Sequence, residues 1–381
     1  MLAPDEKLKL SPKPYLSATP GFAGGADTPR DFLERCLADL AALEPKIGAF
    51  VNLNLAGARS AADRATARWR EGRPLSKIDG MPVGIKDIIE TADMPTENGS
   101  PLFAGFRSER DAASVAALRE AGAVVVGKTV TTEFAASEPR GTRNPHDLRR
   151  TPGGSSSGSA AGVAAGMMSA ALGTQVIGST IRPASYCGCV GFKVTVGALN
   201  RGGSYDGLSQ SSSGVLAATL EDAWQVAYEI AVRAGGDPGY PGLFGPASTP
   251  APKKPHRVAF LETPGWATAS AGAKQAMTDA LARLEAAGID VLTPQLPCQG
   301  CRRRGGDRAS APALDAHQRL GIALAAQYLS RAGCEQAQQR HARTSRRSRG
   351  HDPRRIPHRS RATRQEPARS MPSLLRTAMP V

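Results

Sequence analysis

The chain has 381 residues and a formal net charge of +14, and 41% of its residues are hydrophobic. That length allows at most two domains, or one large domain with a sizeable core. It carries neither an N-terminal signal-peptide pattern nor an apolar run of bilayer-spanning length, so the sequence predicts a cytoplasmic protein without a membrane partner.

Residues 1–27 are rich in Pro and Gly and are expected to form an extended segment. Thr28 and Pro29 then mark a helix start, with Thr as the N-cap and Pro in the first turn. Apolar residues recur behind them at helical spacing and predict a packing face: Phe32, Leu33, Cys36, Leu37, Leu40 and Leu43. A second, more polar helix is predicted over residues 55–71.

Helices alternate with short apolar strands along the rest of the chain. Strands are predicted at 80–89, 123–129, 258–262 and 289–292, and helices at 111–121, 219–233 and 267–287. This alternation predicts an α/β protein with a layered sheet.

Residues 151–183 combine a Gly/Ser-rich loop, GGSSSGS (153–159), with a run of small apolar residues. Such a loop can be a flexible linker, a phosphate cradle or a catalytic loop. The linker interpretation is weakened because the loop continues directly into a helix that must be buried. Gly162 and Gly166 are four residues apart, which predicts that both lie on one face of this helix, where another backbone can approach.

Several motifs in this region and around it resemble the amidase signature family of serine hydrolases. They are GMPVGIKD (80–87), the GGSSSGS loop, GTQVIGSTIRPASYCG (173–188) and GFKVT (191–195) followed by GAL (197–199). Their order and spacing also fit the family, and the similarity extends from about residue 28 to about residue 297. The resemblance implies a mixed β-sheet flanked by helices in one domain, 28–297, with an incomplete C-terminal part.

The family acts through a Ser–Ser–Lys triad, and the resemblance assigns its members here. Ser179 would be the acylated nucleophile, and Ser155 would bridge it to Lys86, the general base. The family holds the peptide bond before the bridging serine in the cis form. Lys86 would have to be neutral part of the time, which requires a desolvated position that lowers its pKa.

The resemblance also implies an oxyanion hole built from the backbone N–H groups of Val176, Ile177, Gly178 and Ser179. The family has glycine where this chain has Ile177, and a β-branched residue fits badly if that position requires a positive φ. Arg182 follows the nucleophile by three residues. It is interpreted either as a clamp for a substrate carboxylate or as a structural cap for nearby carbonyl groups.

The six cysteines do not indicate a metal site. Cys187 and Cys189 are expected to be packing residues, and Cys298 and Cys301 form a lone CxxC without a second pair. No metal and no organic cofactor are expected. Scattered cysteines in a chain without an export signal are typical of a reducing compartment.

Residues 298–381 differ from the rest of the chain in composition. They contain 18 Arg, no Lys and 5 acidic residues, which leaves residues 1–297 nearly neutral. Apart from a stretch near 311–330, they have no helical period and are expected to be a disordered tail. The tail is interpreted as a nucleic-acid-binding or lipid-binding arm, as an ordinary solvated tail, or as translation in a shifted reading frame. The all-Arg bias and the abrupt loss of family resemblance favour the third.

The motifs together predict an amidase that cleaves small carboxamides to a carboxylate and ammonia through an acyl-serine. An alternative is the glutamine-hydrolysing subunit of a tRNA-dependent amidotransferase. A second alternative is an inactive protein whose basic tail binds nucleic acid. The predicted partners are a small amide substrate and a second copy of the chain, and nucleic acid is not expected.

Overall fold

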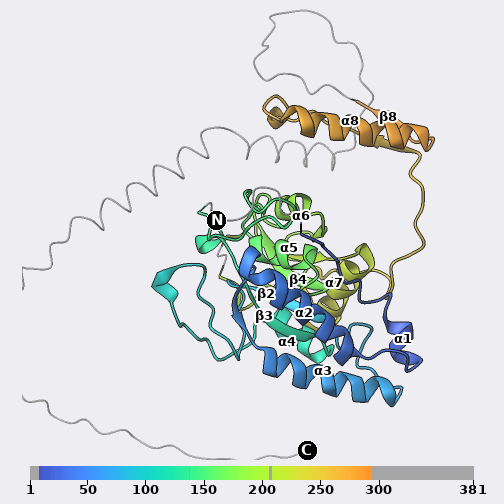
Figure 1. Cartoon of the computed structure of the whole chain (residues 1–381). Coiled ribbons are helices and arrows are strands. Elements are labelled where there is room, and N and C mark those ends of the chain that lie inside the picture. Colours follow the sequence, from blue (N-terminus) through green and yellow to red (C-terminus); the bar gives the residue numbers. More distant parts are fainter. Residues whose placement is uncertain (1–7, 137, 206–207, 294–381) are drawn as a thin grey trace, which may run out of the picture. The chain divides into compact units, whose positions relative to one another are not determined.

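The computed structural model describes residues 8–136, 138–205 and 208–293. Its contacts divide the chain after Pro255, so the two parts are described separately. The first part contains, in chain order, α1 (Thr19–Ala23), α2 (Pro29–Ile47), β1 (Phe50–Leu53), α3 (Leu55–Arg70), β2 (Pro82–Lys86), η1 (Pro101–Phe103), α4 (Ala113–Glu120), β3 (Val124–Thr129), η2 (Glu133–Ala135), α5 (Ser157–Ala164), β4 (Ala170–Gln175), α6 (Ile181–Cys187), β5 (Val190–Lys193), β6 (Ser212–Ala217) and α7 (Leu220–Ala234) (Figure 1).

These strands form one six-stranded sheet in the order β1-β3-β2-β4-β6-β5. The central strands β3, β2 and β4 are parallel, whereas β1, β6 and β5 pair antiparallel with their neighbours. The parallel pair β2 and β3 is joined by a crossover that contains α4, as parallel neighbours require. The prediction of a mixed sheet flanked by helices is confirmed.

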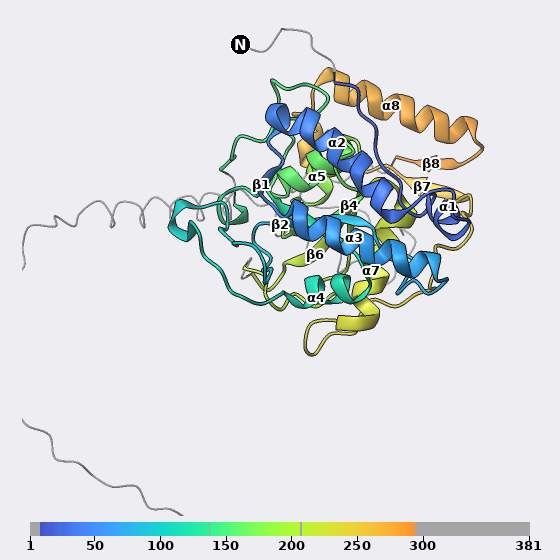
Figure 2. The same ribbon diagram turned by 60° about the horizontal axis from the view of Figure 1, so that its bottom comes forward.

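Both faces of this sheet are buried, which explains the continuous apolar run in β3. Val125 contributes to a core shared with α4 and α7, whereas Val124 and Val126 contribute to a core shared with α2, α3 and α5. Figure 2 shows α2 and α3 side by side, and α4 beside α7. Successive side chains of a strand point to opposite faces, so one strand anchors both helical layers.

The N-terminal segment packs on the body of the first part. Tyr15 is fully buried, and the N–H groups of Tyr15 and Leu16 each donate to the Asp222 carboxylate at 3.0 Å. A short helix, α1, interrupts the segment that was expected to be extended.

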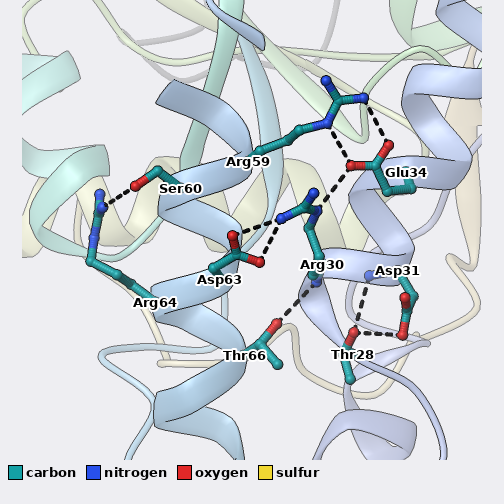
Figure 3. Close-up of polar contacts among 9 residues, drawn as sticks. All are labelled: Thr28, Arg30, Asp31, Glu34, Arg59, Ser60, Asp63, Arg64 and Thr66. Carbon is teal, nitrogen blue, oxygen red and sulfur yellow. Dashed lines mark hydrogen bonds and ion pairs between the residues drawn. The ribbon is translucent and has the colours of Figure 1, made fainter. Parts of the chain in front are cut away.

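Helix α2 begins as its sequence predicts and is joined to α3 by ion pairs. The Thr28 hydroxyl accepts a hydrogen bond from the N–H of Asp31 at 3.0 Å. Arg30 of α2 contacts Asp63 of α3, and Arg59 of α3 contacts Glu34 of α2 (Figure 3).

The helix after the Gly/Ser-rich loop is shorter than predicted. It ends at Ala164, and Gly166 has a φ of +76° in the turn that leads to β4. The prediction that Gly162 and Gly166 share one helix face is therefore wrong. Close backbone approaches occur at Gly158 and Gly166, where a Cβ would lie 2.1 Å from the carbonyl oxygens of Ala49 and Ser11, respectively.

The second part contains β7 (Arg257–Ala259), η3 (Pro264–Trp266), α8 (Ala271–Ala286) and β8 (Asp290–Leu292). Its two strands pair in parallel, which confirms the predicted strand–helix–strand order. None of the described helices has the length and apolar character needed to cross a membrane. The expectations for residues 298–381, including Cys298 and Cys301, lie outside the described residues.

Candidate active site

Lys86 is the last residue of β2, at the carboxyl end of a central parallel strand. Its side chain is fully buried. The Nζ atom donates to Ser155 Oγ at 2.8 Å and to Thr174 Oγ1 at 2.9 Å. The contact with Ser155 is one that the family resemblance implies. Thr174 was not singled out from the sequence, because a threonine at the end of a strand carries no signal of its own.

Ser155 lies in the Gly/Ser-rich loop that enters α5. The Gly154–Ser155 peptide bond is cis. Ser155 is fully buried, and its carbonyl oxygen accepts a hydrogen bond from the N–H of Thr132 at 3.2 Å. Gly153 has a φ of +79°, and a Cβ there would lie 3.1 Å from the Cα of Pro183, so glycine suits this turn.

Ser179 lies in the loop between β4 and α6 and is partly exposed. Its carbonyl oxygen accepts a hydrogen bond from the N–H of Ser156 at 3.1 Å. This bond joins the Ser179 loop directly to the loop of Ser155. The structure therefore brings the segments of Lys86, Ser155 and Ser179 together, although they are separated by up to 93 positions in the chain.

A buried glutamine holds the loop after Ser179. Gln175 Oε1 accepts hydrogen bonds from the N–H groups of Thr180 and Ile181 at 2.9 and 3.0 Å. Across the described residues, the N–H groups of Ile177, Gly178 and Ser179 donate to no protein acceptor. Such unpaired N–H groups can receive a negatively charged oxygen.

Ile177 fits its position without the backbone conformation that would require glycine. Among the described residues, the non-glycine residues with positive φ are Asn98, Glu109, Phe134 and Ala135. The side chain of Ile177 is 80% exposed. Ile177 therefore does not have the positive φ at which a β-branched residue would fit badly.

Arg182 contacts the backbone beside Ser155. Its Nε and Nη2 atoms donate to the carbonyl oxygen of Gly154 at 3.1 and 2.8 Å. This geometry matches the interpretation of Arg182 as a cap for a nearby carbonyl. Arg182 also lines a pocket of about 300 Å³, together with Arg140, Gly153 and Tyr186.

A second buried lysine lies on the neighbouring strand. Lys128 Nζ lies 3.2 Å from Asp87 Oδ1 and donates to Thr96 Oγ1 at 2.7 Å. Burial raises the pKa of Asp87 and lowers the pKa of Lys128, and the charge of each partner opposes the shift. The N–H of Asp87 donates to the carbonyl oxygen of Thr129 at 3.0 Å, so this network fixes the backbone directly after Lys86.

The chain is similar to several known proteins. The sequence model of the family described as Amidase matches residues 31–299. The chain is 43% identical over 242 residues to the A-subunit of the glutamyl-tRNA(Gln) amidotransferase from Chloroflexus aggregans, covering 61% of this chain and 49% of that protein. It is 41% identical over 189 residues to the corresponding protein of Anaeromyxobacter sp., covering 48% and 38%. The chain therefore spans about half the length of these relatives or less.

Solved structures show the same fold. The native peptide amidase from Stenotrophomonas maltophilia matches with a TM-score of 0.64 and 32% identity, covering 75% of this chain and 63% of that chain. A 6-aminohexanoate cyclic dimer hydrolase matches with a TM-score of 0.63 and 27% identity, covering 74% and 60%.

Proposed function

This chain belongs to the amidase family, and from that premise we propose that it hydrolyses the C–N bond of small carboxamides through an acyl-serine. The observation that carries the proposal is the fully buried hydrogen bond between Lys86 Nζ and Ser155 Oγ. Burial disfavours the charged ammonium form of a lysine. A lysine that acts as a base must be neutral, so a buried position suits this role.

The proposed reaction begins when Ser179 Oγ attacks the amide carbon. The Ser179 proton passes to Ser155 Oγ, which releases its own proton to Lys86 Nζ. The proton then returns to the leaving nitrogen, the C–N bond breaks, and ammonia departs. Water attacks the resulting ester, which releases the carboxylic acid and restores the Ser179 hydroxyl.

The N–H groups of Ile177, Gly178 and Ser179 are proposed to stabilise the oxyanion, together with that of Val176. Removing one such donor typically costs about 10²- to 10³-fold in rate. Thr174 is proposed as a positioning residue, because its hydroxyl holds Lys86 Nζ from a second direction.

Arg182 is proposed to bind a carboxylate on the substrate in the pocket that it lines. A guanidinium has five N–H donors, and the contacts with Gly154 use those of Nε and Nη2. The expected result is that Arg182→Ala lowers kcat/KM for succinamate more than for butyramide, which lacks the carboxylate. An equal decrease in kcat/KM for both substrates would support only the role of Arg182 as a cap for the Gly154 carbonyl.

A fluorophosphonate probe tests the triad directly. The wild-type protein should be labelled, and Ser179→Ala and Lys86→Ala should abolish labelling. The surface variants Ser17→Ala and Lys77→Ala are matched controls that should keep it. Absence of labelling in a wild-type protein that circular dichroism shows to be folded would contradict the proposal.

The amidotransferase relatives favour a second candidate, a subunit that hydrolyses glutamine for a partner enzyme. Glutaminase activity that emerges only when a partner protein is added would support this candidate. Hydrolysis of small amides by the chain alone would support the amidase. We propose that this amidase is a cytoplasmic homodimer. Light scattering of the purified protein would test whether it is a dimer.

A further inference from the structure

The pocket that Arg182 lines carries a second guanidinium group, that of Arg140. The two arginines come from different segments, since Arg182 belongs to α6 and Arg140 to the loop that precedes the Gly/Ser-rich loop. The pocket has a volume of about 300 Å³ and is called the two-arginine pocket below. None of the described residues that line it is acidic, so the lining holds two positive charges and no counter-charge.

Arg140 differs in its contacts from two other arginines of the same loop. Arg149 and Arg150 both form ion pairs with the carboxylate of Asp147, at 3.0 and 3.1 Å. The exposed side chain of Arg140, in contrast, has no ion pair or hydrogen bond with any residue in the described ranges. Its guanidinium is therefore available to an anion that enters the pocket.

Two hydroxyl groups of the pocket already have acceptors for their protons. Thr132 Oγ1 donates to the carbonyl oxygen of Ala136 at 2.8 Å, and Thr142 Oγ1 donates to that of Gly48 at 2.7 Å. A hydroxyl group has one proton to donate, so neither group has another for a ligand. The guanidinium N–H groups are therefore better placed than these hydroxyls to recognise a ligand in this pocket.

A second pocket, of about 220 Å³, shares Arg140 but has acidic residues in its lining. They are Asp87 and Glu97. Two carboxylates would repel a negatively charged ligand, whereas a second guanidinium would attract it. An anion that contacts Arg140 is therefore favoured in the two-arginine pocket.

The two-arginine pocket lies beside the candidate triad. Gly153 and Gly154 line it, and the Gly154 carbonyl that accepts from Arg182 belongs to the peptide bond of Ser155. Arg182 also follows Ser179 by three residues. A molecule whose anionic part occupies this pocket can therefore place another part at the triad.

We propose that the two-arginine pocket selects amides whose acyl group carries two carboxylates, and that Arg140 is the residue that determines specificity for the second one. The inference rests on the proposed amidase function and on the proposed binding of one carboxylate by Arg182. The planar fork of a guanidinium matches the geometry of a carboxylate, and two carboxylates neutralise both arginines. A cavity of about 150 Å³ is enough for benzene, so a small dicarboxylate fits a pocket of about 300 Å³.

Two amides that differ by one carboxylate test the role of Arg140. Wild-type kcat/KM for 3,3-dicarboxypropionamide should exceed that for succinamate by about 10- to 150-fold, the usual worth of a hydrogen bond to a charged group. Arg140→Ala should remove most of this preference. Arg143→Ala is the matched control and should keep it, because Arg143 is an exposed arginine of the same loop that lines neither pocket. A wild-type enzyme without the preference, or an Arg140→Ala enzyme that keeps it, would overturn the proposal.

Binding separates failure of the pocket from failure of the proposed reaction. In Ser179→Ala protein, calorimetry should show that adding Arg140→Ala weakens the affinity for 3,3-dicarboxypropionamide at least about tenfold, whereas adding Arg143→Ala does not. The difference should shrink in high salt, because salt screens charges at an exposed site. Affinity that Arg140→Ala leaves unchanged would overturn the proposal, whether or not amides are hydrolysed. Weakened affinity without any hydrolysis would support the pocket and contradict the proposed reaction alone.

Discussion

Two buried lysines on adjacent strands have different kinds of partner. Lys86 ends β2 and donates to the hydroxyls of Ser155 and Thr174, whereas Lys128 of β3 is paired with the Asp87 carboxylate in addition to the Thr96 hydroxyl. A carboxylate stabilises the charged form of a lysine, so the surroundings of Lys128 suit a structural cation. The hydroxyl partners of Lys86 can exchange protons with its amine, and this arrangement suits a lysine that acts as a base. The comparison teaches that burial alone does not identify a reactive lysine, because its partners decide its role.

The largest expected effect comes from removing the amine of Lys86. Lys86→Met should lower kcat/KM on a cleaved amide by at least about 10²- to 10⁴-fold, the usual contribution of a general base. The fold should persist, because methionine fills a similar volume and needs no hydrogen-bond partner. Steady-state kinetics and thermal unfolding measure the two properties. A variant that keeps its activity would remove Lys86 from the mechanism.

The corresponding substitution at Lys128 should mainly lower the free energy of unfolding. Lys128→Met leaves the Asp87 carboxylate buried without its cation, which should cost about 3–5 kcal/mol of unfolding free energy. Urea denaturation measures this loss. The double variant Lys128→Met with Asp87→Asn is the control and should recover part of the stability. If it recovers none, the ion pair is not the source of the loss.

The pH dependence of this variant follows from the raised pKa of Asp87. Without Lys128, whose charge opposes the rise, that pKa should be higher still. A carboxyl group with a raised folded pKa binds its proton in the folded state at a pH where the unfolded state is ionised. The stability deficit of Lys128→Met should therefore be largest near pH 7 and shrink as the pH falls through the folded pKa. A deficit that grows on acidification would contradict this assignment.

Removal of one of the two hydroxyl groups that contact Lys86 Nζ should have an intermediate effect on activity. Thr174→Val keeps the shape of the side chain but removes the acceptor 2.9 Å from Lys86 Nζ. The loss of one buried hydrogen bond is worth about 1–3 kcal/mol, which corresponds to roughly 5- to 150-fold if it affects kcat. Thr174→Ser should restore activity and the pH profile. An unchanged pH–rate profile in Thr174→Val would argue against a positioning role.

The smallest effect is expected at the surface network between α2 and α3 (Figure 3). Contacts with Arg59 and Arg30 lower the pKa of Glu34 to about 2, below its ordinary value of 4.5. This contribution to stability is present above pH 4.5 and is lost as the pH falls toward 2. Because the pair is exposed, Glu34→Gln should cost only about 0.2–1 kcal/mol at pH 7, and less in high salt. Glu71→Gln is the exposed control, and an equal loss there would mean that the network adds no stability of its own.

The sequence by itself determined part of the local structure and the identity of the candidate triad residues. The cap at Thr28 and the buried strand 124–129 follow from side chains a few residues apart, so their signals are contained in short windows. Lys86, Ser155 and Ser179 were found through motifs whose order is preserved along the chain. Strands β1, β4, β5 and β6 were not predicted, because these short segments owe their form to pairing with neighbouring strands.

Only the tertiary structure decided which polar groups meet. The pairing of Asp87 with Lys128, the contact of Thr174 with Lys86 and the packing of Phe134 against Phe103 join residues 31 to 88 positions apart. No local pattern in either segment encodes such a contact, because its energy arises only after the sheet has aligned the strands. The same holds for Arg182, because the fold brings its guanidinium to the carbonyl oxygen of Gly154, 28 positions away in the chain.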